Sequence, residues 1–190
     1  MTTFFTADLH LRHKRIMQLC HRDIFLKDIR KMNNGLIANW NRVVTKHDVI
    51  YHIGDFCYTD NPDIYAKYMH RIHGKTIFIR GNHDVGLQHA NYYICRNIEG
   101  MKIFMRHWPP WQLLDTHKKY GHQIEVPIDV DLILCGHVHN AWKWKYYVHK
   151  IGQRKIPVIN IGTDVWGYKP VSLNNIMEEI GKWVSAKQKQ

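Results

Sequence analysis

Apolar runs of strand length recur along the whole chain. They are Phe4–Ala7, Val49–Ile53, Thr76–Ile79, Tyr92–Ile94, Lys102–Met105, Leu132–Cys135, Lys143–Val148 and Lys155–Ile161. Their length and apolar character predict β-strands. Glu99-Gly100 lies between two of these runs and Gly152 between another two, so each position predicts a hairpin turn.

Three other segments carry apolar residues at helical spacing. They are residues 26–40, residues 64–72 and residues 173–180. Pro62 precedes the second segment and Ser172 the third, as expected for a first-turn proline and a serine N-cap. Strands and helices alternate in the first part of the chain and strands pair in the second, which predicts a mixed α/β fold.

Composition restricts the class of protein further. The chain has 190 residues, of which 45% are hydrophobic, and no linker or repeat divides it, so we expect one domain over residues 1–190. The formal net charge of +11 favours phosphate-bearing or polyanionic partners. A basic protein without such a partner would show the same charge.

The cysteines and the N-terminus indicate where the protein works. Four cysteines are present, and none forms a C-x-x-C pair, so neither a disulfide framework nor a zinc ribbon is expected. The N-terminus becomes charged too early for a signal peptide, and no stretch reaches the ~20 apolar residues of a membrane span. We therefore expect a cytoplasmic protein without membrane contact, and the oligomeric state stays open.

Side chains that can bind metals follow five of the expected strands directly. These residues are Asp8, His10, Asp55, Asn82, His107, His137 and His139. Because ligand sites gather beyond the carboxyl ends of strands in α/β sheets, we expect the five strand ends to surround one site. Glycines precede Asp55, Asn82 and His137, where the backbone must turn sharply and let a ligand approach.

The chemistry of this set favours a pair of metal ions. Imidazole and oxygen ligands without a thiolate suit Mn²⁺, Fe²⁺, Ni²⁺ or Zn²⁺. Seven ligands are too many for one tetrahedral ion and fit two ions that share a carboxylate, an arrangement that binds phosphoryl groups. Each motif alone has an ordinary structural explanation, and with 15 histidines an H-x-H pair arises by chance. The ordered combination of all five motifs at strand ends has no such ordinary explanation.

At these residues the chain resembles the calcineurin-like metallophosphoesterase superfamily, and its flanks resemble the small single-domain branch of bacteria and phages. The motifs that carry the resemblance are D-x-H at Asp8 and His10, G-D at Gly54-Asp55, G-N-H-D at residues 81–84, a later His107, and G-H-x-H at residues 136–139. The resemblance implies two packed mixed β-sheets flanked by helices, and two divalent ions, with Mn²⁺ favoured.

The resemblance also implies a role for each residue. One ion would be held by Asp8, His10, Asp55 and His139, and the other by Asp55, Asn82, His107 and His137. A water or hydroxide between the ions would attack phosphorus in line. His83 would protonate the leaving oxygen as general acid, and Asp84 would orient His83.

One position departs from the family pattern, and three further residues are candidates for substrate contact. Protein phosphatases of the superfamily carry an Asp-Arg pair after their G-D, whereas Phe56 and Cys57 follow here, which disfavours a phosphoserine phosphatase. Arg12 and His13 either line the site or lie on a helix surface. Arg106 either approaches the phosphate or points into solvent, and we favour solvent.

One aromatic segment, one histidine and one aspartate outside the ligand set have their own interpretations. Trp142, Trp144 and Tyr146 would share one strand face with lysines on the other, a pattern that suits nucleic-acid contact, a half-buried strand or a dimer interface. His52 is expected to be buried rather than a ligand. Asp164 is expected to close the core near the site without a chemical role.

Three functions compete on these grounds. The first is a two-metal phosphoesterase acting on a phosphodiester, which is favoured, or on a small phosphorylated molecule. Because no inserted cap interrupts the motifs, its site is expected to be open to varied or extended substrates. The second is a nuclease or an enzyme that processes RNA ends or cyclic nucleotides, supported by the charge and the Trp/Lys segment. The third is a non-catalytic metal-binding scaffold, which the presence of every ligand and of His83 disfavours.

Overall fold

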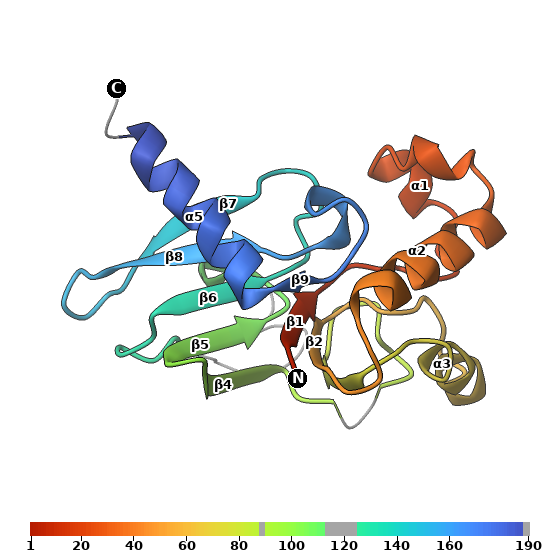
Figure 1. The fold of residues 1–190 in the computed structure, drawn as a ribbon, viewed down its shortest axis with the longest axis horizontal. Coiled ribbons are helices and arrows are strands. Elements are labelled where there is room, and N and C mark those ends of the chain that lie inside the picture. Colours follow the sequence, from red (N-terminus) through yellow and green to blue (C-terminus); the bar gives the residue numbers. More distant parts are fainter. Residues whose placement is uncertain (88–89, 113–124, 188–190) are drawn as a thin grey trace.

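The computed structural model describes residues 1–87, 90–112 and 125–187 (Figure 1). The strands are β1 (Thr3–Thr6), β2 (Val49–Ile53), β3 (Lys75–Ile79), β4 (Tyr93–Ile98), β5 (Met101–Arg106), β6 (Leu132–Cys135), β7 (Trp144–Val148), β8 (Lys155–Asn160) and β9 (Val171–Ser172). The helices are α1 (Ile16–Leu19), α2 (Ile29–Val43), α3 (Pro62–Met69) and α5 (Leu173–Lys187), with short 3-10 turns at Asp23–Phe25, Pro110–Gln112 and Thr163–Val165.

Two sheets form the centre of the molecule. The first has the strand order β3-β2-β1-β9 and the second the order β4-β5-β6-β8-β7. Strands β1, β2 and β3 run parallel, and β9 runs antiparallel to β1. In the second sheet β5, β6 and β8 run parallel, and the outer strands β4 and β7 run antiparallel to them. Both sheets are therefore mixed, which confirms the fold expected from the resemblance.

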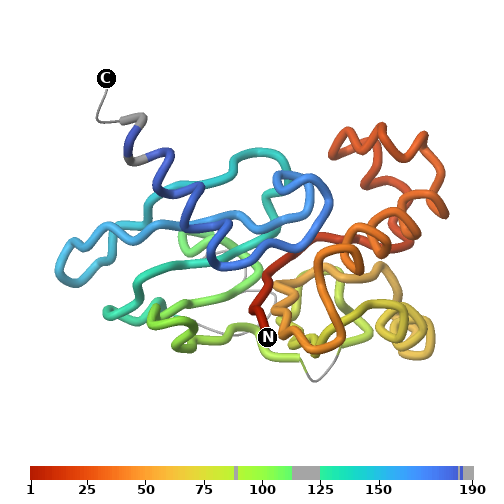
Figure 2. The backbone as a smooth tube through the Cα atoms, in the orientation of Figure 1, coloured from red at the N-terminus to blue at the C-terminus, as the bar shows by residue number. Residues whose placement is uncertain are grey.

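The chain path explains how the two sheets meet. The first part of the chain, red to yellow in Figure 2, builds most of the first sheet with α1, α2 and α3, and the second part, green to blue, builds the second sheet. Strand β9 then returns to pair with β1. The main core lies between the sheets and contains Phe5 and Ile53 from one and Met105 and Leu134 from the other.

The ends of several elements follow from the local sequence. Asp28 accepts hydrogen bonds from the backbone N–H groups of Arg30 and Lys31, so α2 begins at Ile29. Leu26, which the periodicity placed in this helix, lies outside it in a left-handed conformation (φ 53°). Ser172 caps α5 as expected, because its Oγ accepts from the backbone N–H of Asn175 at 3.2 Å.

The two expected hairpins are present. Glu99 and Gly100 have φ angles of 51° and 83° between the antiparallel strands β4 and β5. Gly152, with φ 72°, lies in the turn between β7 and β8. The four cysteines are free, and no helix within the described ranges is long and apolar enough to cross a membrane. The cytoplasmic location stays a prediction.

His52 is a buried histidine in the packing between the first sheet and α2, and it is not one of the gathered ligands. Its ring centroid lies 6.2 Å from Trp40, 5.2 Å from Phe56 and 5.7 Å from Phe78. Neither ring nitrogen has a hydrogen-bond partner among the described residues. Burial lowers the pKa of His52 to about 3. The fold therefore keeps this imidazole neutral in an aromatic environment.

Replacement of His52 by phenylalanine is expected to stabilise the protein by about 1–3 kcal/mol at neutral pH, because two unpaired buried nitrogens are removed. His52 takes a proton near pH 6.5 only in the unfolded state, so its contribution to stability falls as the pH falls. Between pH 7.5 and pH 5 this linkage lowers the free energy of unfolding of the wild type by ~2 kcal/mol, and the variant lacks this pH dependence. Urea denaturation of both proteins at the two pH values measures the difference. Equal pH dependence would contradict the assignment.

Candidate metal centre

Five of the expected ligands leave their strands in left-handed backbone conformations. The φ angles are 59° at Asp8, 50° at His10, 58° at Asp55, 72° at His137 and 46° at His139. A non-glycine residue in this region carries about 1–2 kcal/mol of strain. Because the strain is repeated at five ligands, the surrounding contacts must hold these loops in place.

The first group of ligands gathers at the end of β1. Asp8, His10 and His139 place ligand atoms within 4.8 Å of one another. The carboxylate of Asp55 is adjacent, with Oδ2 at 3.4 Å from His10 Nε2. His10 Nε2 is buried and has no hydrogen-bond partner among the described residues, as expected for an atom that faces a cation.

The second group lies between β2, β3, β5 and β6. His107 Nε2 lies 3.3 Å from Asp55 Oδ2 and 3.1 Å from Asn82 Oδ1. His137 Nδ1 lies 3.0 Å from the same Asn82 oxygen. Asp55 thus touches both groups. The structure thus brings all seven expected ligands together around Asp55.

The imidazoles are oriented as metal ligands usually are. His107 Nδ1 lies 2.9 Å from the backbone oxygen of Ile53, so Nε2 is the nitrogen that faces Asp55 and Asn82. His139 Nδ1 lies 3.0 Å from Asp164 Oδ2, so Nε2 is the nitrogen that remains for a metal, and the side chain also hydrogen-bonds with Cys20. A carbonyl or carboxylate behind the ligand ring is the common support of a metal-bound histidine.

The carboxylates also indicate a cation between them. Burial raises the pKa of Asp8 to about 6, against the opposing effect of His107. Burial lowers the pKa of His107, but the charge and hydrogen bond of Asp55, the charge of Asp8 and the contact with the Ile53 oxygen together raise it to about 9. Two buried carboxylates among imidazoles are stabilised by positive charge, which divalent ions provide.

Glycines form close walls around these carboxylates. A Cβ on Gly81 would lie 2.1 Å from Asp55 Oδ1, and one on Gly54 would lie 2.3 Å from His107 Nδ1. A Cβ on Gly136 or Gly162 would lie 2.6 or 2.7 Å from Asp8 Oδ2. The expected need for glycine before Asp55, Asn82 and His137 is therefore confirmed, and Gly162 is a further position of the same kind.

His83 occupies the solvent side of the centre. Its backbone N–H donates to Asp55 Oδ1 at 2.8 Å, and its ring centroid lies 5.2 Å from that of His10. His83 also belongs to a group with His10 and Asp55 whose ligand atoms lie within 4.8 Å of one another. Distances of this size suit a proton donor beside the centre or an additional ligand, and the metal content of a variant separates the two.

Asp84 has a different role from the one expected. Its Oδ2 accepts from the backbone N–H groups of Asp55 (2.6 Å) and Gly81 (2.9 Å), and its Oδ1 accepts from the N–H of Phe56 (2.9 Å) and the hydroxyl of Tyr65 (2.7 Å). These contacts tie the Asp55 and Gly81 turns together. Asp84 therefore holds the strained loop of the shared carboxylate, and the expectation that it orients the His83 ring is corrected.

Arg22 and Asp164 form a buried support that the sequence did not reveal. Arg22 Nε and Nη2 donate to the two Asp164 oxygens at 2.7 and 2.9 Å, and both side chains are at most 1% exposed. Arg22 also donates to the backbone oxygens of Leu9 (2.9 Å) and Asp8 (2.7 Å). One guanidinium thus holds the Asp8 loop and, through Asp164, the ring of His139.

Asn160, at the end of β8, supports the loop that carries His139. Its Nδ2 donates to the backbone oxygens of His139 (2.6 Å) and Trp142 (2.7 Å), and its Oδ1 accepts from the N–H of Gly162 (2.8 Å). Nothing in the sequence distinguished this asparagine from an ordinary strand end.

The three proposed substrate residues have different positions. His13 is half-buried, with Nδ1 3.2 Å from His10 Nδ1, and Arg12 is exposed at the edge of the centre. Arg106 is 1% exposed, so the favoured orientation toward solvent is wrong. Its place in β5 puts it on the face of Phe104, opposite Met105 and the inter-sheet core. Burial lowers its pKa to about 10.

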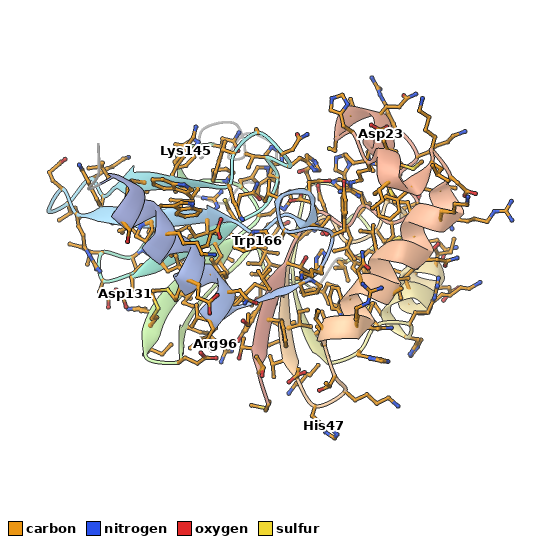
Figure 3. All side chains as sticks on the ribbon, turned by 45° about the horizontal axis from the view of Figure 1, so that its top comes forward. Asp23, His47, Arg96, Asp131, Lys145 and Trp166 are labelled. Atoms are coloured by element: carbon orange, nitrogen blue, oxygen red, sulfur yellow. The ribbon has the colours of Figure 1, made fainter. Side chains whose placement is uncertain are left out.

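The Trp/Lys segment keeps the expected shared face for Trp144 and Tyr146, whose ring centroids lie 5.4 Å apart in β7, but not for Trp142. Trp144 stacks on Trp183 of α5 at 4.5 Å, whereas Trp142 precedes β7 and packs against Trp111 at 5.4 Å. Lys143 pairs with Glu179 and covers the ring of Trp166, which lies near the middle of Figure 3. Lys145, an exposed residue of β7 that is labelled in Figure 3, lies over Trp111 and Trp142. The lysines thus contact aromatic rings of the same chain.

Comparisons with known proteins agree with this geometry. The chain is 30% identical over 180 residues to the uncharacterized protein MJ1445 of Methanocaldococcus jannaschii, covering 94% of this chain and 91% of that protein. It is 32% identical over 197 residues to the gene 66 protein of Mycobacterium phage L5, covering 87% of each. The crystal structure of protein AQ665 from Aquifex aeolicus matches with a TM-score of 0.65 and 22% identity over 93% of this chain and 98% of that one. A family model for the calcineurin-like phosphoesterase superfamily domain matches residues 1–170. The chain therefore belongs to the calcineurin-like phosphoesterase superfamily.

Proposed function

We propose that the protein is a metal-dependent phosphoesterase that hydrolyses phosphodiesters with two divalent ions, Mn²⁺ being favoured. The observation that carries this proposal is the position of Asp55, whose Oδ2 lies 3.4 Å from His10 Nε2 and 3.3 Å from His107 Nε2. One carboxylate is thus shared by two ligand groups. Two ions bound there would lower the pKa of a water molecule and neutralise the charge of the phosphoryl group.

The chain's own residues supply the other parts of the reaction. Asp8, His10, Asp55 and His139 would hold one ion, and Asp55, Asn82, His107 and His137 the other. With only two carboxylates among these ligands, the loaded centre keeps an excess of positive charge and attracts a phosphate ester. His83 stands beside it on the loop that Asp84 anchors, and we assign it the transfer of a proton to the leaving oxygen.

The preference for diesters is supported by the segments that follow Asp55 and precede His107, which offer the phosphate no guanidinium. Phe56 and Cys57 follow Asp55 and are buried, so this loop offers no guanidinium to the phosphate. Arg106 is buried on the outer face of its sheet and offers none either. A phosphodiester carries less negative charge than a monoester at neutral pH and needs fewer such contacts. The nuclease alternative has less support than its sequence pattern suggested, since Lys143 and Lys145 contact other groups of the chain.

Hydrolysis by the reconstituted protein tests the proposal. Metal-free protein is loaded with Mn²⁺, Ni²⁺, Fe²⁺ or Zn²⁺ and assayed on bis-p-nitrophenyl phosphate, p-nitrophenyl phosphate, 2′,3′-cyclic nucleotides and single-stranded RNA or DNA. We expect faster hydrolysis of the diester than of the monoester, with Mn²⁺ or Ni²⁺ the best ions.

The control for this assay is Asp55→Asn, which weakens the shared ligand and is expected to lose both bound metal and activity. A preference for p-nitrophenyl phosphate would contradict the diesterase assignment. Bound metal without hydrolysis of any ester would instead support a non-catalytic scaffold.

A further inference from the structure

Two cavities flank the candidate metal centre within the described part of the chain. The first has a volume of about 520 Å³ and the second about 560 Å³. The first arm, as we call it, is lined by His10, His13, Arg15, Ile16 and His139 among others. The second arm is lined by Arg12, Thr59, Asp60, Asn82 and Val85 among others. Each volume lies within the about 300–1,000 Å³ range of small-molecule sites.

The two arms meet at the centre itself. Tyr58 and His83 line both of them. The first arm includes His10 and His139, which belong to one ligand group, and the second includes Asn82, which belongs to the other. A phosphoryl group bound at the two ligand groups therefore lies at the junction, and its substituents have an open cavity on each side.

Tyr58 lines both arms and lies at the boundary between them. Its ring stacks on His13 with centroids 4.4 Å apart and planes 13° apart, and His13 lines only the first arm. The backbone N–H of Tyr58 donates to the oxygen of Leu11 at 2.8 Å, which anchors the residue. Tyr58 is still 51% exposed and also lines the second arm, so His13 does not cover the whole ring.

The charged and apolar residues that line the two arms indicate the chemistry of a ligand that fits them. Exposed guanidinium groups stand at both, Arg15 at the first and Arg12 at the second. Each arm also offers aliphatic surface, Ile16 in the first and Val85 in the second. Such a lining suits an organic substituent with a flat apolar part and hydrogen-bond acceptors, and a free aromatic face binds planar rings by stacking.

We propose that the preferred substrate is a phosphodiester with a sizeable organic substituent on each side of phosphorus, and that Tyr58 selects it by stacking on a planar ring in the second arm. This inference rests on the proposed phosphoesterase function and deepens it. A monoester, or a diester with one very small substituent, would leave one arm filled only by solvent.

The test compares two diesters with the same leaving group, phenyl p-nitrophenyl phosphate and methyl p-nitrophenyl phosphate, on Mn²⁺-loaded protein. For Tyr58→Leu we expect the phenyl-to-methyl ratio of kcat/KM to fall about tenfold, through a higher KM for the phenyl ester. Tyr58→Phe should keep the wild-type ratio, because it keeps the ring. Using the change in ratio removes the intrinsic difference in reactivity between the two esters.

The matched control is Tyr146→Leu, which removes a tyrosine of similar exposure (42%) on β7 that lines neither arm. It should leave the ratio unchanged. An unchanged ratio in Tyr58→Leu, or an equal loss on both esters, would overturn the role of Tyr58. Failure of the wild-type protein to hydrolyse either ester with metal bound would instead overturn the proposed function, so the two failures are distinguishable.

Discussion

Replacement of His83 by alanine is expected to lower kcat about 10²–10⁴-fold on p-nitrophenyl diesters while the bound metal stays at the wild-type level, because a positioned general acid contributes a factor of this size. The ring stands at the junction of the two cavities, beside both ligand groups, while Asp84 holds its loop through the amides of Asp55 and Gly81. Loss of the ring therefore removes a proton donor without removing the backbone that carries Asp55. Steady-state kinetics and metal analysis by mass spectrometry measure the two quantities on the same preparation.

The matched control for His83 is His13→Ala, which removes a neighbouring imidazole from the same cluster, 5.5 Å away between ring centroids. We expect a smaller loss of kcat from His13→Ala, since His13 borders only the first cavity. A fall in metal content in His83→Ala would contradict the proposed role and make His83 a ligand together with His10 and Asp55.

The gathering of the candidate ligands was predictable from the sequence because these residues follow the ends of apolar runs. Asp8, Asp55, Asn82, His107 and His137 each come within three residues after an apolar run, and parallel strands bring such positions to one edge. The expected hairpins and the Ser172 cap were predictable for a similar reason, since they depend on local residues with specific conformational preferences. The start of α2 was missed by three residues because an apolar Leu26 continued the periodicity into a left-handed turn.

The supports of the centre could not be predicted, because they join residues far apart in sequence. Arg22 and Asp164 are 142 positions apart, and Arg22 stands among other basic residues that look the same in sequence. Asp84 follows His83 directly, which suggested a contact between the two side chains. Its carboxylate turns instead to the amides of Asp55, Phe56 and Gly81, a contact that only the packed loops create. The charge of Arg106 favours a position in solvent, yet the interior position of β5 in its sheet buries it.

Replacement of Arg22 by methionine is expected to destabilise the protein by about 3–5 kcal/mol, because it leaves the buried carboxylate of Asp164 without its cation. The same change removes the donors to the backbone oxygens of Asp8 and Leu9, so the left-handed loop of the first ligand group loses its support. We therefore also expect metal affinity to fall about 10–100-fold, as is typical when a ligand's supporting partner is lost. Urea denaturation of the metal-free protein and titration with Mn²⁺ measure the two effects separately.

A surface ion pair provides the matched control for Arg22→Met. Arg154 donates to Asp131 at 2.9 Å, but the two side chains are 46% and 40% exposed. Solvent screens such a pair, so Arg154→Met should cost about 1 kcal/mol or less and leave Mn²⁺ binding unchanged. The double variant Arg22→Met/Asp164→Leu should recover part of the stability lost in Arg22→Met, because no buried charge remains unpaired, but not the metal affinity, because His139 Nδ1 and the Asp8 oxygen still lack their partners. Recovery of both stability and metal affinity in the double variant would show that this buried pair supports only the fold. An effect of Arg22→Met no larger than that of Arg154→Met would show that the pair supports neither the fold nor the centre.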